Sequence, residues 1–166
     1  MREPRPIPGG RALLFDRLVD LEPASPQESP PFRVLDRQAL EQSVRREVAR
    51  VLNTRCPRPE RLQEEGERTV LNYGVPDFSF LAAAGTTDRQ RLADDLTQAV
   101  VAYEPRLSQV RVTLDSIEGN PTALVGRIEA VLAVGMVGEA VAFPLLIQLK
   151  AGEIELLVET LSRLAG

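Results

Sequence analysis

An acidic and a basic residue lie two positions apart in Glu104-Pro105-Arg106. They are the clearest candidates in the sequence for a charged functional site. Proline lacks an N–H and disfavours the α region for the residue before it, so Pro105 is expected to end a helix near Glu104. Residues 110–115 then alternate with a period of two, which is typical of a strand. The pattern predicts a rigid helix-to-strand junction that holds a carboxylate on one side and a guanidinium on the other.

Histidine is absent from the 166 residues, which removes the commonest general base and metal ligand. Mechanisms that pair serine or cysteine with histidine are therefore excluded. Cys56 is the single cysteine, which excludes an internal disulfide and a cysteine-built metal site. The sequence thus predicts no metal and no cofactor, and any catalysis would depend on carboxylates.

Composition is that of an ordinary globular chain, with 43% hydrophobic and 27% charged residues. It contains no apolar run long enough to cross a bilayer and no signal-peptide pattern, so the expectation is a cytoplasmic protein without membrane insertion. Arg45, Arg46 and Arg50 lie on one helix face. Because the chain is acidic overall and lacks aromatic residues near this face, we expect solvent or a protein partner there rather than nucleic acid.

Two principal helices are predicted to position the junction. Asp36 can cap a helix that continues to about Thr54. Thr87-Asp88-Arg89-Gln90 matches a capping box and predicts the start of a second helix, which ends at the junction. The apolar stripes of the two helices consist of Leu40, Val44, Val48, Val51 and Leu52, and of Leu92, Leu96, Val100 and Tyr103.

Alternating apolar residues after the junction predict three strands, over residues 110–117, 123–134 and 140–149. The turns at residues 118–121 and 135–138 are so short that neighbouring strands must be antiparallel. Residues 153–158 fit a fourth strand, although Ile154, Leu157 and Leu161 fit a helix almost as well. We prefer the strand.

An ordered loop is predicted between the two helices, at Tyr73-Gly74-Val75-Pro76-Asp77. Gly74 permits a positive φ, and Pro76 presets its own φ. Tyr73 and Phe78 can hold the loop against the core.

Residues 1–31 are predicted to form an extension outside the main domain. Residues 1–10 include three prolines and two glycines and are expected to trail in solution. Residues 11–21 offer Leu14 and Leu18 at helical spacing, followed by a Pro-rich linker at residues 22–31. This short helix can pack on its own core or dock on another protein, and docking makes both leucines candidate partner-binding residues.

The order of several segments resembles the TssE family of type VI secretion baseplate subunits, which is similar to the lysozyme-like wedge proteins of contractile phage tails. The resemblance covers about residues 11–158. Its most specific segments are Asn53-Thr54-Arg55, Tyr73-Gly74-Val75-Pro76-Asp77 and Glu104-Pro105-Arg106. Cys56 departs from the pattern, since a basic residue would be expected there.

This resemblance implies a structural subunit rather than an enzyme. Such a subunit sits in the baseplate wedge with TssF and TssG, with TssK as a further candidate partner. It lies next to the inner tube and starts polymerisation of the contractile sheath. The motif Glu104, Pro105 and Arg106 would be the family's signature contact, and Arg55, Tyr73 and Asp77 are further candidate partner-binding residues.

The lysozyme-like label raises a second hypothesis, a carboxylate-dependent peptidoglycan hydrolase. Glycoside hydrolysis needs two carboxylates about 5 to 10 Å apart, one of them protonated in a partly apolar cleft. Glu104 could be that acid, with Asp77 or Asp115 as its partner. However, Arg106 favours the ionised form of Glu104, and the chain has no tryptophan for a sugar-stacking cleft. No catalytic residue is therefore assigned.

The fold class predicted is α+β, with two principal helices packed on one face of a three- to four-stranded antiparallel sheet and an N-terminal helical segment on a Pro-rich linker. Residues 32–166 would form the lysozyme-like baseplate wedge domain.

Arg106 has two possible roles, a contact with a partner or an ion pair with Glu104 or the Asp77 loop. An exposed ion pair is worth about 0 to 1 kcal/mol, whereas truncating a desolvated interface charge costs roughly 2 to 5 kcal/mol of affinity. We expect the contact, with Arg106→Ala changing the free energy of unfolding by no more than about 1 kcal/mol. A C-terminal strand edge is the expected site for an incoming sheath chain.

Overall fold

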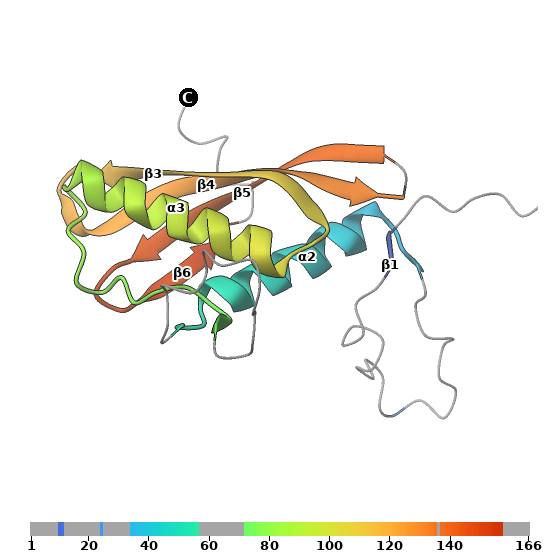
Figure 1. Ribbon diagram of the computed structural model, residues 1–166, viewed down its shortest axis with the longest axis horizontal. Coiled ribbons are helices and arrows are strands. Elements are labelled where there is room, and N and C mark those ends of the chain that lie inside the picture. Colours follow the sequence, from blue (N-terminus) through green and yellow to red (C-terminus); the bar gives the residue numbers. More distant parts are fainter. Residues whose placement is uncertain (1–9, 12–23, 25–33, 57–71, 136, 158–166) are drawn as a thin grey trace, which may run out of the picture.

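A four-stranded antiparallel sheet and two helices form the main body of the molecule in the computed structural model, which describes residues 10–11, 24, 34–56, 72–135 and 137–157 (Figure 1). The strand order is β3-β4-β5-β6, and consecutive strands are neighbours. The elements are α2 (Arg37–Leu52), α3 (Thr86–Tyr103), β3 (Leu107–Ile117), β4 (Asn120–Val134), β5 (Val137–Gln148) and β6 (Glu153–Leu156). The predicted α+β class is confirmed.

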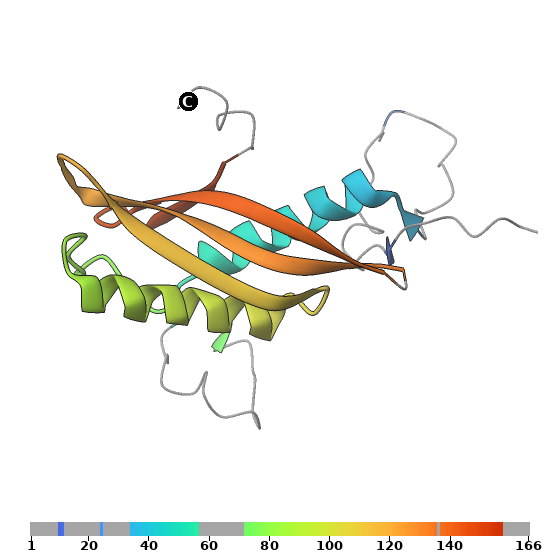
Figure 2. The same cartoon turned by 90° about the horizontal axis from the view of Figure 1, so that it is seen from above.

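Both helices bury their apolar stripes in a single core with the inner face of the sheet. Helix α3 lies along β3, and α2 lies toward β6 (Figure 2). The largest fully buried side chains on the sheet come from β4 and β5 and include Ile128, Phe143, Leu145 and Ile147. The core thus joins residues that the sequence separates by about a hundred positions.

Helix α2 forms as predicted, because Asp36 caps it and its apolar residues recur at helical spacing. The Asp36 side chain accepts a hydrogen bond of 2.8 Å from the Ala39 N–H. All five predicted apolar residues of the stripe are buried, and Ser43 is buried among them. The helix ends at Leu52, where Asn53 is the C-terminal cap and donates from Nδ2 to the Ala49 carbonyl at 2.9 Å.

Helix α3 begins at Thr86, with Gly85 as its N-terminal cap, so the predicted capping box at Thr87 is wrong. Because the N-terminal cap is a glycine, no side-chain hydrogen bond caps the helix. Instead, Asp88 in the first turn places a carboxylate at the positive end of the helix dipole, which is favourable without a capping hydroxyl. The helix ends at Tyr103 before Glu104, as Pro105 predicts.

The three long strands begin before their predicted first residues. In β3 a register shift lies between Ser108 and Arg111, and Gln109 has a φ of 52°. This bulge lets Leu107 and Val112 both be buried, although strict alternation would place them on opposite faces of the sheet. Strand β6 confirms the fourth strand that the period-two pattern favoured over a helix.

A short second ladder lies near the start of α2. Strand β1 (Gly10–Arg11) pairs antiparallel with β2 (Val34–Leu35). Gly10 was expected to trail in solution, and this prediction is wrong. The ladder needs only backbone N–H and C=O groups, and it begins after the last proline of residues 1–10. Leu14, Leu18, the Pro-rich linker apart from Ala24, and Val158 lie outside the described residues.

Within the described part of the chain, no helix has both the length and the apolar character that crossing a bilayer requires.

Candidate functional site

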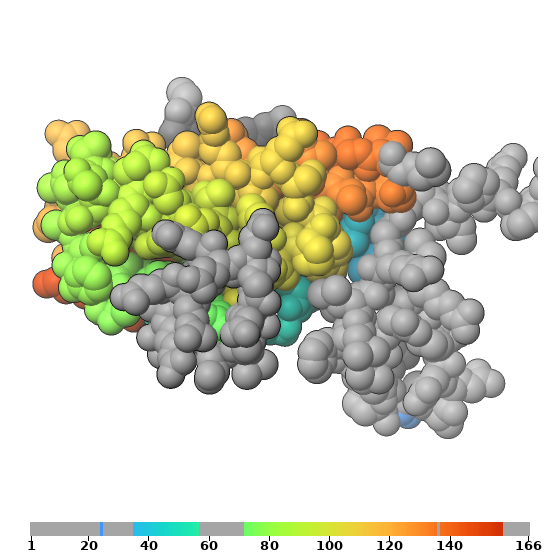
Figure 3. All heavy atoms as spheres, in the orientation of Figure 1, coloured from blue at the N-terminus to red at the C-terminus, as the bar shows by residue number. Residues whose placement is uncertain are grey.

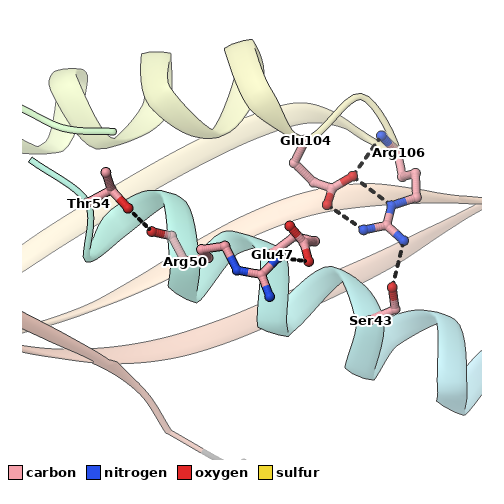
Figure 4. A network of polar contacts seen from close by, with 6 residues as sticks. All are labelled: Ser43, Glu47, Arg50, Thr54, Glu104 and Arg106. Atoms are coloured by element: carbon pink, nitrogen blue, oxygen red, sulfur yellow. Dashed lines mark hydrogen bonds and ion pairs between the residues drawn. The ribbon is translucent and has the colours of Figure 1, made fainter. Parts of the chain in front are cut away.

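Glu104 and Arg106 form an ion pair across the helix-to-strand junction (Figure 4). Arg106 donates from Nε to Oε1 of Glu104 at 2.7 Å and from Nη2 to Oε2 at 2.6 Å. The Arg106 backbone N–H also reaches Oε1, at 3.2 Å. The Glu104 side chain is 1% exposed and that of Arg106 is 13% exposed, so the pair is largely removed from water.

The third nitrogen of the Arg106 guanidinium is bound by α2. Nη1 donates to the Ser43 hydroxyl oxygen at 2.9 Å, across 63 residues of sequence. Leu107 N–H donates to the Glu104 carbonyl, which closes a turn with Pro105 at its second position. The Arg106 carbonyl accepts from Ala133 N–H of β4. The junction is therefore fixed to α2, α3 and the sheet at once.

The geometry shows which ion pair Arg106 makes within the chain. It pairs with Glu104, not with the Asp77 loop. We revise the expected stability change of no more than about 1 kcal/mol for Arg106→Ala, because that figure applies to an exposed pair and this pair is largely buried. Removing one partner of a buried pair leaves the other charge uncompensated, at a cost of about 3 to 5 kcal/mol.

Asn53-Thr54-Arg55 binds the end of α2 to β6 and to the loop that precedes α3. Arg55 Nη1 donates to the Leu52 carbonyl at 2.9 Å, and Nη2 donates to the Gly152 carbonyl. The guanidinium carbon lies 4.3 Å from the centre of the Phe78 ring, which is a cation–π contact. Burial lowers the pKa of Arg55, although Asp77 opposes this effect.

Along the exposed side of α2, Arg50 pairs with Glu47, and the Thr54 hydroxyl donates to the Arg50 carbonyl at 2.8 Å (Figure 4). These contacts form a polar row along the helix from Glu47 toward Arg55.

The segment from Tyr73 to Asp77 packs beside Thr54. Val75 N–H donates to the Thr54 carbonyl at 2.9 Å, and Cys56 N–H donates to the Val75 carbonyl at 2.8 Å. Gly74 has a φ of 112°, and a Cβ there would lie 2.3 Å from the Thr54 carbonyl oxygen, so only glycine fits. The ordered loop predicted from Gly74 is confirmed.

Two tyrosines connect this loop to the junction. The rings of Tyr73 and Tyr103 meet edge to face with centroids 4.9 Å apart. Burial raises the pKa of Tyr73, and the negative charge of Glu47 adds to this effect. The Tyr73 phenol therefore stays neutral at physiological pH.

Asp77 is exposed at the end of this loop. Its Oδ1 accepts from the Ser79 N–H at 2.9 Å, and hydrogen bonds from Ser79 lower the pKa of Asp77. The two remaining candidates, Leu14 and Leu18, lie outside the described residues. The structure thus brings Glu104, Arg106, Tyr73 and Arg55 together around α2, and places Asp77 at the end of the same loop.

This arrangement does not suit the acid-base chemistry of a glycoside hydrolase. Both Glu104 oxygens accept hydrogen bonds from Arg106 and the side chain is 1% exposed, so the carboxyl group is occupied within the chain. The lowered pKa of Asp77 also favours its ionised form. Asp115 is exposed on β3. Among the described residues, no group of three or more His, Cys, Asp or Glu side chains could hold a metal ion.

Sequence reasoning missed two residues of this region. Ser43 interrupts the apolar stripe of α2 at a buried position, and this polar residue on an apolar face was the available signal. Phe80 is 77% exposed, and no periodic pattern distinguishes it from the buried Phe78.

A family profile described as baseplate wedge protein gp25 matches residues 38–135, from the first turn of α2 to the end of β4. The chain belongs to this family. All three motifs described above lie within the matched residues of this gp25 family member, and the wedge-protein resemblance predicted from them is confirmed.

Two solved structures are similar to this gp25 family member. One is a chain of the baseplate complex from the type VI secretion system, at 18% identity and a TM-score of 0.46, covering 64% of this chain and 93% of that one. The other is a protein from Geobacter sulfurreducens described as a tail lysozyme, also at 18% identity and a TM-score of 0.46, covering 76% of this chain and 97% of that one. No curated protein matches the sequence significantly.

Proposed function

We propose that this chain is a structural wedge subunit of a type VI secretion baseplate, which binds TssF and TssG and starts polymerisation of the contractile sheath. TssK, the sheath proteins and the inner-tube proteins are its further expected neighbours, in the cytoplasm and without nucleic acid. The observation that carries the proposal is the family match over residues 38–135, which contains all three motifs of the resemblance.

The motif at the junction would act through its shape. Pro105 is exposed, and the Arg106 side chain keeps a small exposed part beside it. Because the ion pair, Ser43 and Ala133 hold this turn, a partner can bind it with little loss of conformational entropy. Tyr73, Arg55 and Asp77 extend the proposed contact along the adjacent loop, and Leu14 and Leu18 would add a second contact from the extension.

Sheath initiation would use an unpaired strand edge. Strand β6 is the last strand of the sheet, and Leu157 N–H donates to the Pro144 carbonyl of β5 at 2.8 Å. By the alternation of an antiparallel ladder, the backbone groups of Leu156 point away from β5. An incoming extended chain could pair with them.

Co-purification tests the proposal. The full chain is expressed with tagged TssF and TssG from the same cells, and we expect the three to elute as one complex after size exclusion. The same chain should release no soluble fragments from purified peptidoglycan. Failure to join the complex, or turnover of peptidoglycan that Glu104→Gln abolishes, would favour the hydrolase hypothesis or another role.

A further inference from the structure

The loop between Asp77 and α3 presents a phenylalanine to solvent. Phe80 is 77% exposed, the highest value among the large hydrophobic side chains of the described residues. Ala82 and Ala84 are exposed beside it in the sequence, and Leu81 is half-buried. An exposed aromatic ring within an apolar loop is typical of a protein contact surface rather than of a surface that only faces solvent.

Charge is missing from the same segment. Residues 78–87, FSFLAAAGTT, contain no charged side chain, although 27% of the whole chain is charged. The centre of a protein interface is typically depleted of charge and enriched in aromatic residues. The loop and the start of α3 form one end of the molecule, shown in green in Figure 3.

The first half of the loop is held rigidly below Phe80. Phe78 is 1% exposed and lies under the Arg55 guanidinium, which is itself bound to two backbone carbonyls. Leu81 N–H donates to the Phe78 carbonyl at 3.1 Å, which makes a turn with Phe80 at its third position. The exposed ring therefore stands on a turn whose base is buried.

The second half is held by the first turns of α3. Arg89 donates from Nη1 to the carbonyls of Ala83 and Ala84, at 2.8 and 3.1 Å. Ala83 is 2% exposed, and Gly85 N–H donates to the Ala82 carbonyl at 3.0 Å. Since both halves are already ordered, little conformational entropy remains to be lost when Phe80 is bound.

Asp77 and Asp88 flank the apolar segment, and Asp88 belongs to the first turn of α3. The Asp77 carboxylate is exposed three residues before Phe80 and is fixed by the Ser79 N–H. Its lowered pKa keeps it ionised at neutral pH. A surface that covers this loop would therefore need a cation opposite Asp77 to avoid burying that charge alone.

We propose that the loop from Asp77 to Gly85 is a docking element, which inserts Phe80 into a concave apolar pocket on another baseplate protein. An arginine or lysine at the rim of that pocket would face Asp77. The inference rests on the proposed function, because that function supplies the class of partner.

The test measures the affinity of the full chain for the purified TssF–TssG complex by biolayer interferometry. Phe80→Ala should weaken binding at least tenfold, as expected for an aromatic anchor. The control is Val137→Ala, since Val137 is 64% exposed on the β4–β5 hairpin at the opposite end of the molecule (Figure 1). That variant should bind within about twofold of wild type. Both melting temperatures should stay within about 2 °C of wild type.

Asp77→Asn examines the rim charge, because the amide oxygen can still accept from the Ser79 N–H. This variant should bind more weakly at low salt and show a flatter dependence of affinity on salt concentration. If Phe80→Ala binds as tightly as wild type, the docking element is refuted while the wedge function stands. If wild type itself does not bind, the proposed function fails and the inference fails with it. Self-association of the purified chain that Phe80→Ala abolishes would overturn it in favour of a second copy.

Discussion

The Asn53 side chain pairs with the backbone of Ile154 as a neighbouring strand would. Asn53 Nδ2 donates to the Ile154 carbonyl at 2.7 Å, and Ile154 N–H donates to Asn53 Oδ1 at 2.9 Å. The carboxamide thus occupies one position of the open edge of β6 and joins it to the end of α2. Arg45 adds a hydrogen bond of 2.6 Å to the carbonyl of Leu157, the residue after β6, so the edge position proposed for an incoming chain is Leu156, between these two contacts.

Asn53→Ala should lower the free energy of unfolding by roughly 1 to 3 kcal/mol, because two partly buried backbone groups of Ile154 lose their partner. Denaturant unfolding measures this change, and hydrogen exchange should show faster exchange of the Ile154 amide. Asn53→Asp keeps an acceptor but places a carboxylate against the Ile154 carbonyl, so it should be destabilised as well. A stable Asn53→Asp would show that only the volume of the side chain matters.

Proline substitutions at two adjacent residues test the strand edge. Leu156→Pro removes an N–H that points away from β5 and should leave the chain folded while reducing sheath assembly. Leu157→Pro removes the N–H that donates to Pro144, so it should lower the melting temperature. Circular dichroism and sheath imaging on the same two variants provide the comparison. If both variants unfold equally, the backbone N–H groups of Leu156 and Leu157 do not point to opposite sides of β6.

Arg106→Ala should destabilise the isolated chain by about 3 to 5 kcal/mol, because the Glu104 carboxyl group, which is 1% exposed, would lose its partner. The double variant Glu104→Leu with Arg106→Leu removes both charges and should regain most of that stability. If this folded double variant no longer binds TssF–TssG, the motif also contacts the partner. Stability of Arg106→Ala within about 1 kcal/mol of wild type would contradict the buried ion pair.

The contribution of Asp77 to stability should depend on pH. Its pKa in the folded state is lowered, so its stabilising contribution is present above the unfolded pKa of about 3.9 and is lost as the pH falls through the folded pKa. Wild type should therefore be more stable than Asp77→Asn at neutral pH, and the difference should vanish in acid. Urea unfolding of both chains from acid to neutral pH measures it. If the stability difference between wild type and Asp77→Asn grew in acid, the lowered pKa of Asp77 would be contradicted.

Local sequence patterns were sufficient to predict the main elements. Pro105 ends α3, Asp36 begins α2 and Gly74 needs its positive φ for reasons that lie within a few residues. The same patterns failed where contacts between residues far apart in the sequence determine the structure. Ser43 meets Arg106 across 63 residues and Asn53 meets Ile154 across 101, and neither pairing has a periodic signal.

Two local predictions failed for a related reason. The residues at Thr87 match a capping box, but Asp88 and Arg89 contact the preceding loop and the helix starts two residues earlier, with Gly85 as its N-terminal cap. The bulge at Gln109 uses a φ that a non-glycine residue rarely adopts, and pairing with β4 maintains it. Of the candidate site, the sequence predicted the Glu104–Arg106 ion pair only as one of two alternatives, because the Ser43 contact that completes it has no local signal.

Assembly of the sheath in cells tests the central claim most directly. A strain that lacks this chain and carries a fluorescent sheath protein should form no extended sheaths, and wild-type protein from a plasmid should restore them. The Glu104→Leu and Arg106→Leu double variant, expressed at the same level, should restore few. Sheaths of normal number and length in the strain without the chain would contradict the account.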